Sequence, residues 1–179
     1  MPPEVLDLFT ELAAVPSPPG QERAVADIVL RYLRDCGLTA DEDDCGPRID
    51  STMGNVYARL EPTAEGEPLF FCAHLDTVPP TAAIEPVVVD DVVRNGAGTI
   101  LGADDKSAVA AMLEGTRRVL VEGRPHAGIE LLFTPKEEVG LNGAYAFDHT
   151  RLQARTGYVY DQAAPIGTVI LGAPFSHAI

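Results

Sequence analysis

The sequence predicts an α/β protein with three layers, in which helices cover both faces of a mostly parallel central sheet. Two observations lead to this class. Short apolar segments alternate along the chain with longer segments whose apolar residues recur at helical spacing. The chain also has 179 residues, of which 46% are hydrophobic, and this is enough for one domain with a buried core.

Two helices are expected near the N-terminus, over residues 3–15 and 22–36. The sequence SPPG at residues 17–20 separates them, because proline and glycine interrupt helices. In the second segment valine, isoleucine, leucine and tyrosine recur three and four residues apart, and Gly37 is a natural end for the helix. The polar segment 41–51 is expected to be irregular.

Short apolar segments predict the strands. They cover residues 55–60, 69–73, 87–89, 129–133, 157–160 and 168–171. Segment 69–73 has no polar alternation, which predicts a strand covered on both faces, and we place segment 87–89 at an edge. The glycine-rich residues 96–102 lead into an expected helix over 106–122, and a short helix is expected over 142–147.

Charge and composition exclude several classes of partner. The formal charge is −14, and so acidic a surface repels the phosphate backbone of nucleic acids. No segment reaches the roughly 18 apolar residues of a membrane span, and the first residues lack the pattern of a signal peptide. Three cysteines without C-x-x-C spacing argue against a disulfide framework. We therefore expect a cytoplasmic protein with no nucleic-acid or membrane partner.

Groups that can bind a metal follow three of the predicted strands and precede one predicted helix. They are His74 and Asp76, then Asp104 and Asp105, then Glu137 and Glu138, and finally Asp161. If the strands are parallel neighbours, these groups converge on one edge of the sheet. Clustered carboxylates repel one another, and a divalent cation relieves that repulsion. Imidazole and oxygen ligands without thiolate suit zinc, manganese or cobalt.

Each group has a plainer interpretation when it is taken alone. His74 and Asp76 could be a hydrogen-bonded surface pair, Asp104–Asp105 a helix N-cap, Glu137–Glu138 a solvated loop, and Asp161 a turn residue. The ordered set of four favours the metal interpretation. Cys72 lies inside an apolar segment and is expected in the core instead of among the ligands.

Four motifs occur in order: HLDTVP at 74–79, LGADDK at 101–106, EEVGLNGA at 137–144, and YD at 160–161. Together they resemble the motif set of the co-catalytic zinc peptidases, a family that includes peptidase T-like tripeptidases, carboxypeptidases, aminoacylases and acetylornithine deacetylases. The GADDK and EEVGL forms are most similar to the peptidase T-like branch. One motif alone would be weak, whereas four in order are specific.

The resemblance implies a site with two zinc ions, for which cobalt or manganese are substitutes. His74 and Asp161 would bind the first zinc, and Glu138 would bind the second. Asp104 would bridge both ions, and the peptide bond between Asp104 and Asp105 would be cis. Asp76 would hydrogen-bond the other ring nitrogen of His74 and so fix its tautomer.

The resemblance also implies hydrolysis of peptide bonds, with short peptides as substrates and release of the N-terminal residue, as in a tripeptidase. Glu137 would take a proton from the water that bridges the zincs and return it to the leaving amine. Two alternatives stay open. The same site could hydrolyse N-acyl amino acids, or the chain could be a catalytically silent metal-binding fragment.

The family's domain plan implies that residues 1–172 form the N-terminal portion of the catalytic domain. Residues 173–179 would then begin the connection to a lid and dimerisation domain. In the family a histidine that follows the lid completes the second zinc site, and His177 is a poor candidate for it. We therefore expect weak binding of the second metal, no lid-mediated homodimer, and an exposed apolar sheet edge that favours other self-association.

Overall fold

A five-stranded sheet with the strand order β1-β2-β6-β3-β7 forms the centre of the computed structural model, which describes residues 4–163, 165 and 167–172. The strands are β1 (Ala40–Glu42), β2 (Val56–Leu60), β3 (Leu69–His74), β6 (Ile129–Thr134) and β7 (Thr156–Val159). β3 is parallel to both β6 and β7, whereas β2 is antiparallel to β1 and β6. The α/β class with a mostly parallel sheet is confirmed.

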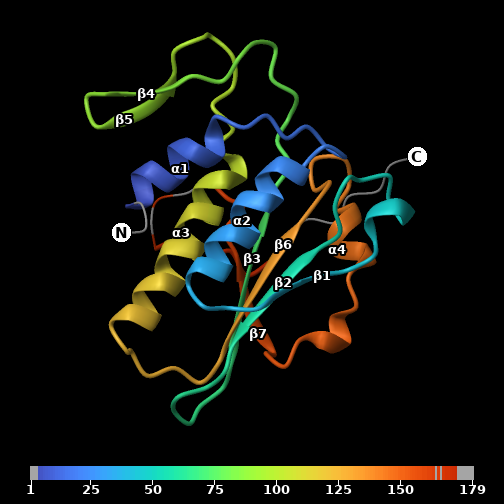
Figure 1. Cartoon of the computed structure of the whole chain (residues 1–179), viewed down its shortest axis with the longest axis vertical. Helices are drawn as coiled ribbons and strands as arrows, with labels where there is room; N and C mark the ends of the chain where they lie inside the picture. Colours follow the sequence, from blue (N-terminus) through green and yellow to red (C-terminus); the bar gives the residue numbers. More distant parts are fainter. Residues whose placement is uncertain (1–3, 164, 166, 173–179) are drawn as a thin grey trace.

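Three helices lie on one face of the sheet (Figure 1). They are α1 (Val5–Ala13), α2 (Arg23–Asp35) and α3 (Ala103–Val121), which confirms the three long helices that the sequence predicts. Their apolar residues recur three and four positions apart and therefore share one side of each helix, which is buried against the sheet. No helix in the described part of the chain is long and apolar enough to cross a membrane.

Alternate residues of the sheet belong to two separate apolar clusters. Leu131 and Phe133 of β6 lie in the large core beneath the helices, while Leu132 packs with Tyr57 and Phe147 on the opposite face. On that second face, Phe147 at the end of α4 (Asn142–Ala146) and Leu152, which follows a short 3-10 helix (His149–Arg151), pack against Tyr57 and Leu132. Because this cover is thin, residues 69–72 of β3 are half-buried, and the expected double burial is reached only toward the end of the strand.

β4 (Pro86–Val89) and β5 (Val92–Asn95) form a separate hairpin. Figure 1 shows it projecting away from the central sheet. Asp90 and Asp91, at its tip, both have positive φ angles, as a tight two-residue hairpin turn requires. The predicted strand over 87–89 is therefore confirmed, and it is an edge strand, although its one partner is β5 and the sheet is the separate hairpin.

Two further predictions differ from the structure. The sequence predicts an irregular segment over 41–51, but its first residues, Asp41 and Glu42, belong to β1, whose backbone pairs with β2 although these two side chains are polar. Segment 168–171 is apolar but forms no strand, and Val169, Ile170 and Leu171 are exposed. A strand needs a neighbour for its backbone N–H and C=O groups, and none lies beside this segment among the described residues.

The outer side of β7 has no strand partner in the described part of the chain. Tyr158, Val159 and Tyr160 are exposed there. Beside them lies an apolar cavity of about 250 Å³ between α3 and the sheet, whose lining includes Met112, Val119 and Tyr160. The expected exposed apolar edge is present, while self-association stays a prediction.

Candidate metal centre

The carboxyl ends of three strands meet at one edge of the sheet. In the parallel register of β3 with β6, His74 lies beside Thr134, and in that of β3 with β7, Cys72 lies beside Val159. The residues that follow these strands therefore start from the same edge, as the sequence predicts. The first turn of α3 brings Asp104 to the same place.

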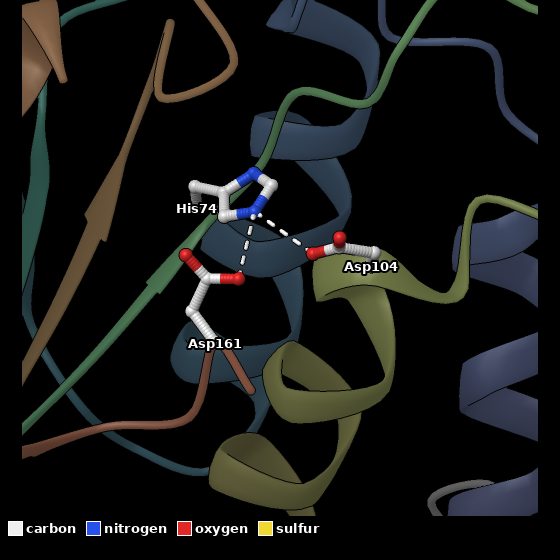
Figure 2. Close-up of side chains that lie close together, drawn as sticks. All are labelled: His74, Asp104 and Asp161. Atoms are coloured by element: carbon white, nitrogen blue, oxygen red, sulfur yellow. Dashed lines mark hydrogen bonds and ion pairs between the residues drawn. The ribbon is translucent and has the colours of Figure 1, made fainter. Parts of the chain in front are cut away.

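His74, Asp104 and Asp161 point toward one another (Figure 2). Nε2 of His74 lies 3.2 Å from Oδ1 of Asp104 and 3.9 Å from Oδ1 of Asp161. One ligand atom from each of the three residues lies within 4.8 Å of the other two. His74 is buried whereas the two carboxylates are exposed, so the group opens to solvent on the side of the acids.

The tautomer of His74 follows from the contact of its other ring nitrogen. Nδ1 lies 2.8 Å from the backbone carbonyl oxygen of Asp76, which can only accept a hydrogen bond. In the neutral ring Nδ1 therefore carries the proton, and Nε2, which faces Asp104 and Asp161, is the nitrogen left to bind a metal. Asp76 orients the ring as expected, but mainly through its carbonyl group, since its carboxylate lies 3.5 Å from Nδ1.

The carboxylate of Asp76 has a second set of contacts that the sequence did not predict. It is fully buried and accepts hydrogen bonds from the backbone N–H groups of Glu137, at 2.9 Å, and of Glu138, at 3.1 Å. Asp76 thus joins the end of β3 to the loop that follows β6. Because 61 residues separate Asp76 from Glu137 in sequence, no local pattern indicates this contact.

Glu137 and Glu138 occupy neighbouring places at the site. Oε2 of Glu137 lies 4.0 Å from Nε2 of His74, and the side chain is about one-quarter exposed. Burial raises the pKa of Glu137, and the charges of Asp161 and Glu138 raise it further, although His74 opposes them. Glu138 lies on the same loop, and burial and the charge of Asp104 raise its pKa. It is not one of the three residues whose ligand atoms meet within 4.8 Å.

Asp105 is a buried carboxyl group to which the sequence assigned no separate role. The peptide bond that joins it to Asp104 is cis, as expected. Asp105 is 2% exposed, and its Oδ2 has no hydrogen-bond partner among the described residues. Burial, together with the charges of Asp161 and Asp104, raises its pKa to about 8. In the sequence, the feature that could have pointed to Asp105 as part of the site is its position directly after Asp104 in the GADDK motif.

The charges of the site fit a divalent cation. Burial alone would lower the pKa of His74, but its hydrogen bond to Asp76 and the charges of Asp76, Asp105 and Asp161 raise it to about 9. Burial and the charge of Asp104 likewise raise the pKa of Asp161, despite the opposing effect of His74. The acidic neighbours thus favour the protonated forms of His74 and Asp161, and a bound cation would compete with those protons.

The donor atoms favour a metal that accepts nitrogen and oxygen ligands. His74 offers a ring nitrogen, while Asp104 and Asp161 offer carboxylate oxygens. Cys72 lies within β3, where it is half-buried beside the smaller apolar cluster, and burial raises the pKa of its thiol to about 12. Zinc, manganese and cobalt suit such a set. His177, the candidate for a late ligand, and the segment 173–179 lie outside the described residues.

Comparisons with known proteins agree with this geometry. Residues 55–169 match the model of peptidase family M28. Aminopeptidase PepT from Bacillus cereus has a similar structure, with a TM-score of 0.85 and 34% identity over 89% of this chain and 43% of that chain. A tripeptidase from Staphylococcus aureus gives a TM-score of 0.84 and 34% identity over the same shares. The resemblance to the peptidase T-like branch is thereby confirmed.

A curated relative of similar sequence is the uncharacterised protein YqjE of Bacillus subtilis. It is 35% identical over 95% of this chain, which corresponds to 46% of YqjE. The chain thus spans less than half the length of YqjE and of the two structures above.

Proposed function

The chain belongs to peptidase family M28, and from this premise we propose that it serves a metal-dependent peptidase that releases the N-terminal residue of short peptides. The observation that carries the proposal is the convergence of His74, Asp104 and Asp161, with Glu137 beside them. The similarity to an aminopeptidase PepT and to a tripeptidase supports short peptides as substrates. Residues 1–172 would be the N-terminal portion of its catalytic domain.

We assign the metal ligands by position. His74 and Asp161 would hold one zinc ion, and Asp104, which lies 3.2 Å from His74, would bridge to a second. Glu138 would bind that second ion. Its carboxylate is close enough to Asp104 for the charge of Asp104 to raise its pKa, and Asp76 holds its backbone at the same edge of the sheet. Asp76 would keep the His74 ring in the tautomer that leaves Nε2 free.

Glu137 would be the general base. Its partial burial and acidic neighbours raise its pKa toward the range in which a carboxylate exchanges protons most effectively near neutral pH. Divalent cations bound at this site would acidify a water molecule and polarise the scissile carbonyl group. Glu137 would accept the proton from the attacking water and deliver it to the nitrogen of the leaving amine. This transfer balances the hydrolysis, since the amine departs neutral and the carboxylate is regenerated.

A substrate panel tests the proposal on the full-length gene product. Ala-Ala-Ala, the same peptide with an acetylated N-terminus, and N-acetylalanine are supplied with zinc, and the products are separated by chromatography. Release of free alanine and Ala-Ala from the unblocked tripeptide alone is expected. Cleavage of N-acetylalanine alone would indicate a deacylase. No cleavage of any substrate, with zinc bound, would indicate a silent metal-binding protein.

A cytoplasmic location is part of the proposal. The three cysteines, Cys36, Cys45 and Cys72, are all free, as expected in a reducing compartment. Fractionation of cells that produce the full-length protein, followed by immunodetection, would place it. Recovery outside the cytoplasmic fraction would contradict this part of the proposal.

A further inference from the structure

We propose that Glu22 is a positioning residue for the catalytic loop, which we define as residues 135–138 and which carries Glu137 and Glu138. The proposal rests on the proposed function, because it concerns how the general base is held. Glu22 lies at the start of α2, and 114 residues separate it from Lys136. It belongs to none of the four motifs that indicate the metal centre.

The Glu22 side chain is fully buried and has three hydrogen-bond donors around it. Its Oε1 accepts from the backbone N–H of Gly20 at 2.6 Å and from that of Lys136 at 3.2 Å. Its Oε2 accepts from the hydroxyl of Ser51 at 2.9 Å. These contacts join the turn before α2, the segment after β1 and the catalytic loop. A buried carboxylate is costly unless hydrogen bonds of this kind compensate it.

Helix capping does not account for Glu22. An acidic residue at the N-cap normally accepts a hydrogen bond from a backbone N–H in the first turn of its own helix. Glu22 occupies the N-cap of α2 but makes no such side-chain contact. Its carboxylate is used for groups outside the helix, and the most distant of these in sequence is Lys136.

Lys136 is the residue at which the catalytic loop changes direction. Its φ angle is 56°, in the left-handed region that residues other than glycine rarely adopt. Its backbone N–H donates to Glu22, and its Nζ donates to the carbonyl oxygens of Ile49 at 2.8 Å and of Asp50 at 3.4 Å. Its own carbonyl oxygen accepts from the backbone N–H of Asn142 at 3.0 Å. Of these contacts, the one to Glu22 is the only one that the backbone N–H of Lys136 makes, so loss of the Glu22 carboxylate would leave that N–H unpaired and loosen the turn that precedes Glu137 and Glu138.

Two buried carboxylates hold three consecutive N–H groups of the loop. Glu22 accepts from Lys136, and Asp76 accepts from Glu137 and Glu138. Asp76 comes from the metal side of the loop, whereas Glu22 comes from the side of α2. The backbone of three consecutive loop residues is thus held by two buried carboxylates from different elements, and this backbone determines where the Glu137 carboxylate lies. A displacement of about 1 Å at such a group can lower a rate about 100-fold.

The kinetic test compares Glu22→Ala with the wild-type, full-length gene product loaded with zinc. We expect kcat on Ala-Ala-Ala to fall at least about tenfold, while KM and zinc content stay within about twofold, because substrate and metal contacts remain. Glu22→Gln keeps an oxygen acceptor for Gly20 and Lys136 and should recover most of kcat. Tyr32→Phe is the matched control, since it removes a 3.0 Å hydrogen bond to Glu114 from the same helix. It should leave kcat unchanged.

Hydrogen exchange provides a readout that does not depend on activity. In Glu22→Ala the peptide that contains residues 134–138 should exchange faster than in wild type, and in Tyr32→Phe it should not. If Glu22→Ala does not fold, Glu22→Gln and Ser51→Ala replace it, and Ser51→Ala should accelerate exchange to a smaller degree because it removes one of three hydrogen bonds.

The outcomes separate the two proposals. Unchanged kcat and unchanged loop exchange in a folded Glu22→Ala variant would overturn the positioning role. A fall in kcat that Tyr32→Phe reproduces would also overturn it, because general destabilisation would then explain the effect. If the wild-type protein cleaves no peptide but Glu22→Ala still accelerates loop exchange, the proposed function fails while the positioning of the loop by Glu22 stands.

Discussion

Oδ1 of Asp76 accepts a 2.9 Å hydrogen bond from the backbone N–H of Glu137, so a residue next to the candidate metal ligand His74 also holds the proposed general base. Oδ2 of the same carboxylate accepts from the N–H of Glu138. Since Asp76 follows β3 and Glu137 follows β6, one buried side chain joins two strand ends. In the proposed mechanism, metal binding by His74 and proton transfer by Glu137 would thereby depend on the same side chain.

Replacement of Glu137 by glutamine should abolish most turnover and leave the metal in place. The amide has nearly the same shape as the carboxylate but cannot accept a proton, and general bases contribute about 10²–10⁴-fold to a rate. The measurement is kcat on Ala-Ala-Ala together with zinc content by elemental analysis. Glu65→Gln, at an exposed position away from the site, is the control. Full activity in Glu137→Gln would remove this residue from the mechanism.

Asp76→Asn should weaken zinc binding and lower kcat together. An asparagine amide offers one oxygen acceptor, so one of the N–H groups of Glu137 and Glu138 would face an NH₂ group and lose its partner. Changes in groups that orient metal ligands typically cost about 10–100-fold in affinity. Isothermal titration with zinc measures this loss. Asp44→Asn, on an almost fully exposed side chain, should leave affinity unchanged, and equal affinities in both variants would contradict the prediction.

The metal-free chain should lose stability as the pH rises from about 5 to about 8. The pKa of His74 is raised from 6.5 to about 9, and burial raises the pKa of Asp105 to about 8 and those of Glu137 and Asp161 above their usual values. The folded chain therefore binds more protons than the unfolded chain in this window, so the unfolding free energy falls with rising pH. Burial lowers the pKa of Lys106 to about 8, which acts in the opposite sense only above that pH.

Thermal unfolding in EDTA and in excess zinc checks this dependence. In EDTA the melting temperature should be lower at pH 8 than at pH 6 by at least a few degrees. Zinc should remove or reverse the trend, because its binding takes the place of the protons. A melting temperature that rises with pH in EDTA would show that the acidic cluster does not retain protons in the folded chain.

The chain should self-associate through the outer side of β7. Val159 is 63% exposed beside the unpaired edge, where backbone groups and apolar side chains are open to a second copy. Val159→Lys should lower the association constant measured by sedimentation velocity over a concentration series, because a charged edge residue resists strand pairing. Val121→Lys is the control, since Val121 is 72% exposed at the end of α3. A constant sedimentation coefficient for the wild-type chain would contradict the prediction.

The sequence by itself determined the elements whose signals are local. Apolar residues three and four positions apart predicted α2, and the continuous apolar segments predicted β3 and β6 to within about one residue. The positions of His74, Glu137–Glu138 and Asp161 after predicted strands, and of Asp104 at the start of a predicted helix, predicted that these residues converge. These signals are readable because each depends on residues within one or two turns of helix, or within one strand.

Only the tertiary structure decided which backbones pair and which buried groups meet. Asp41 and Glu42 are polar and still belong to a strand because β2 pairs with them, whereas the apolar segment 168–171 forms no strand with any of the described residues. The contacts of Asp76 with Glu137 and of Glu22 with Lys136 join residues 61 and 114 positions apart. Which donor meets a buried acceptor depends on the elements that the fold brings together. The residues next to that acceptor in the chain do not indicate the donor.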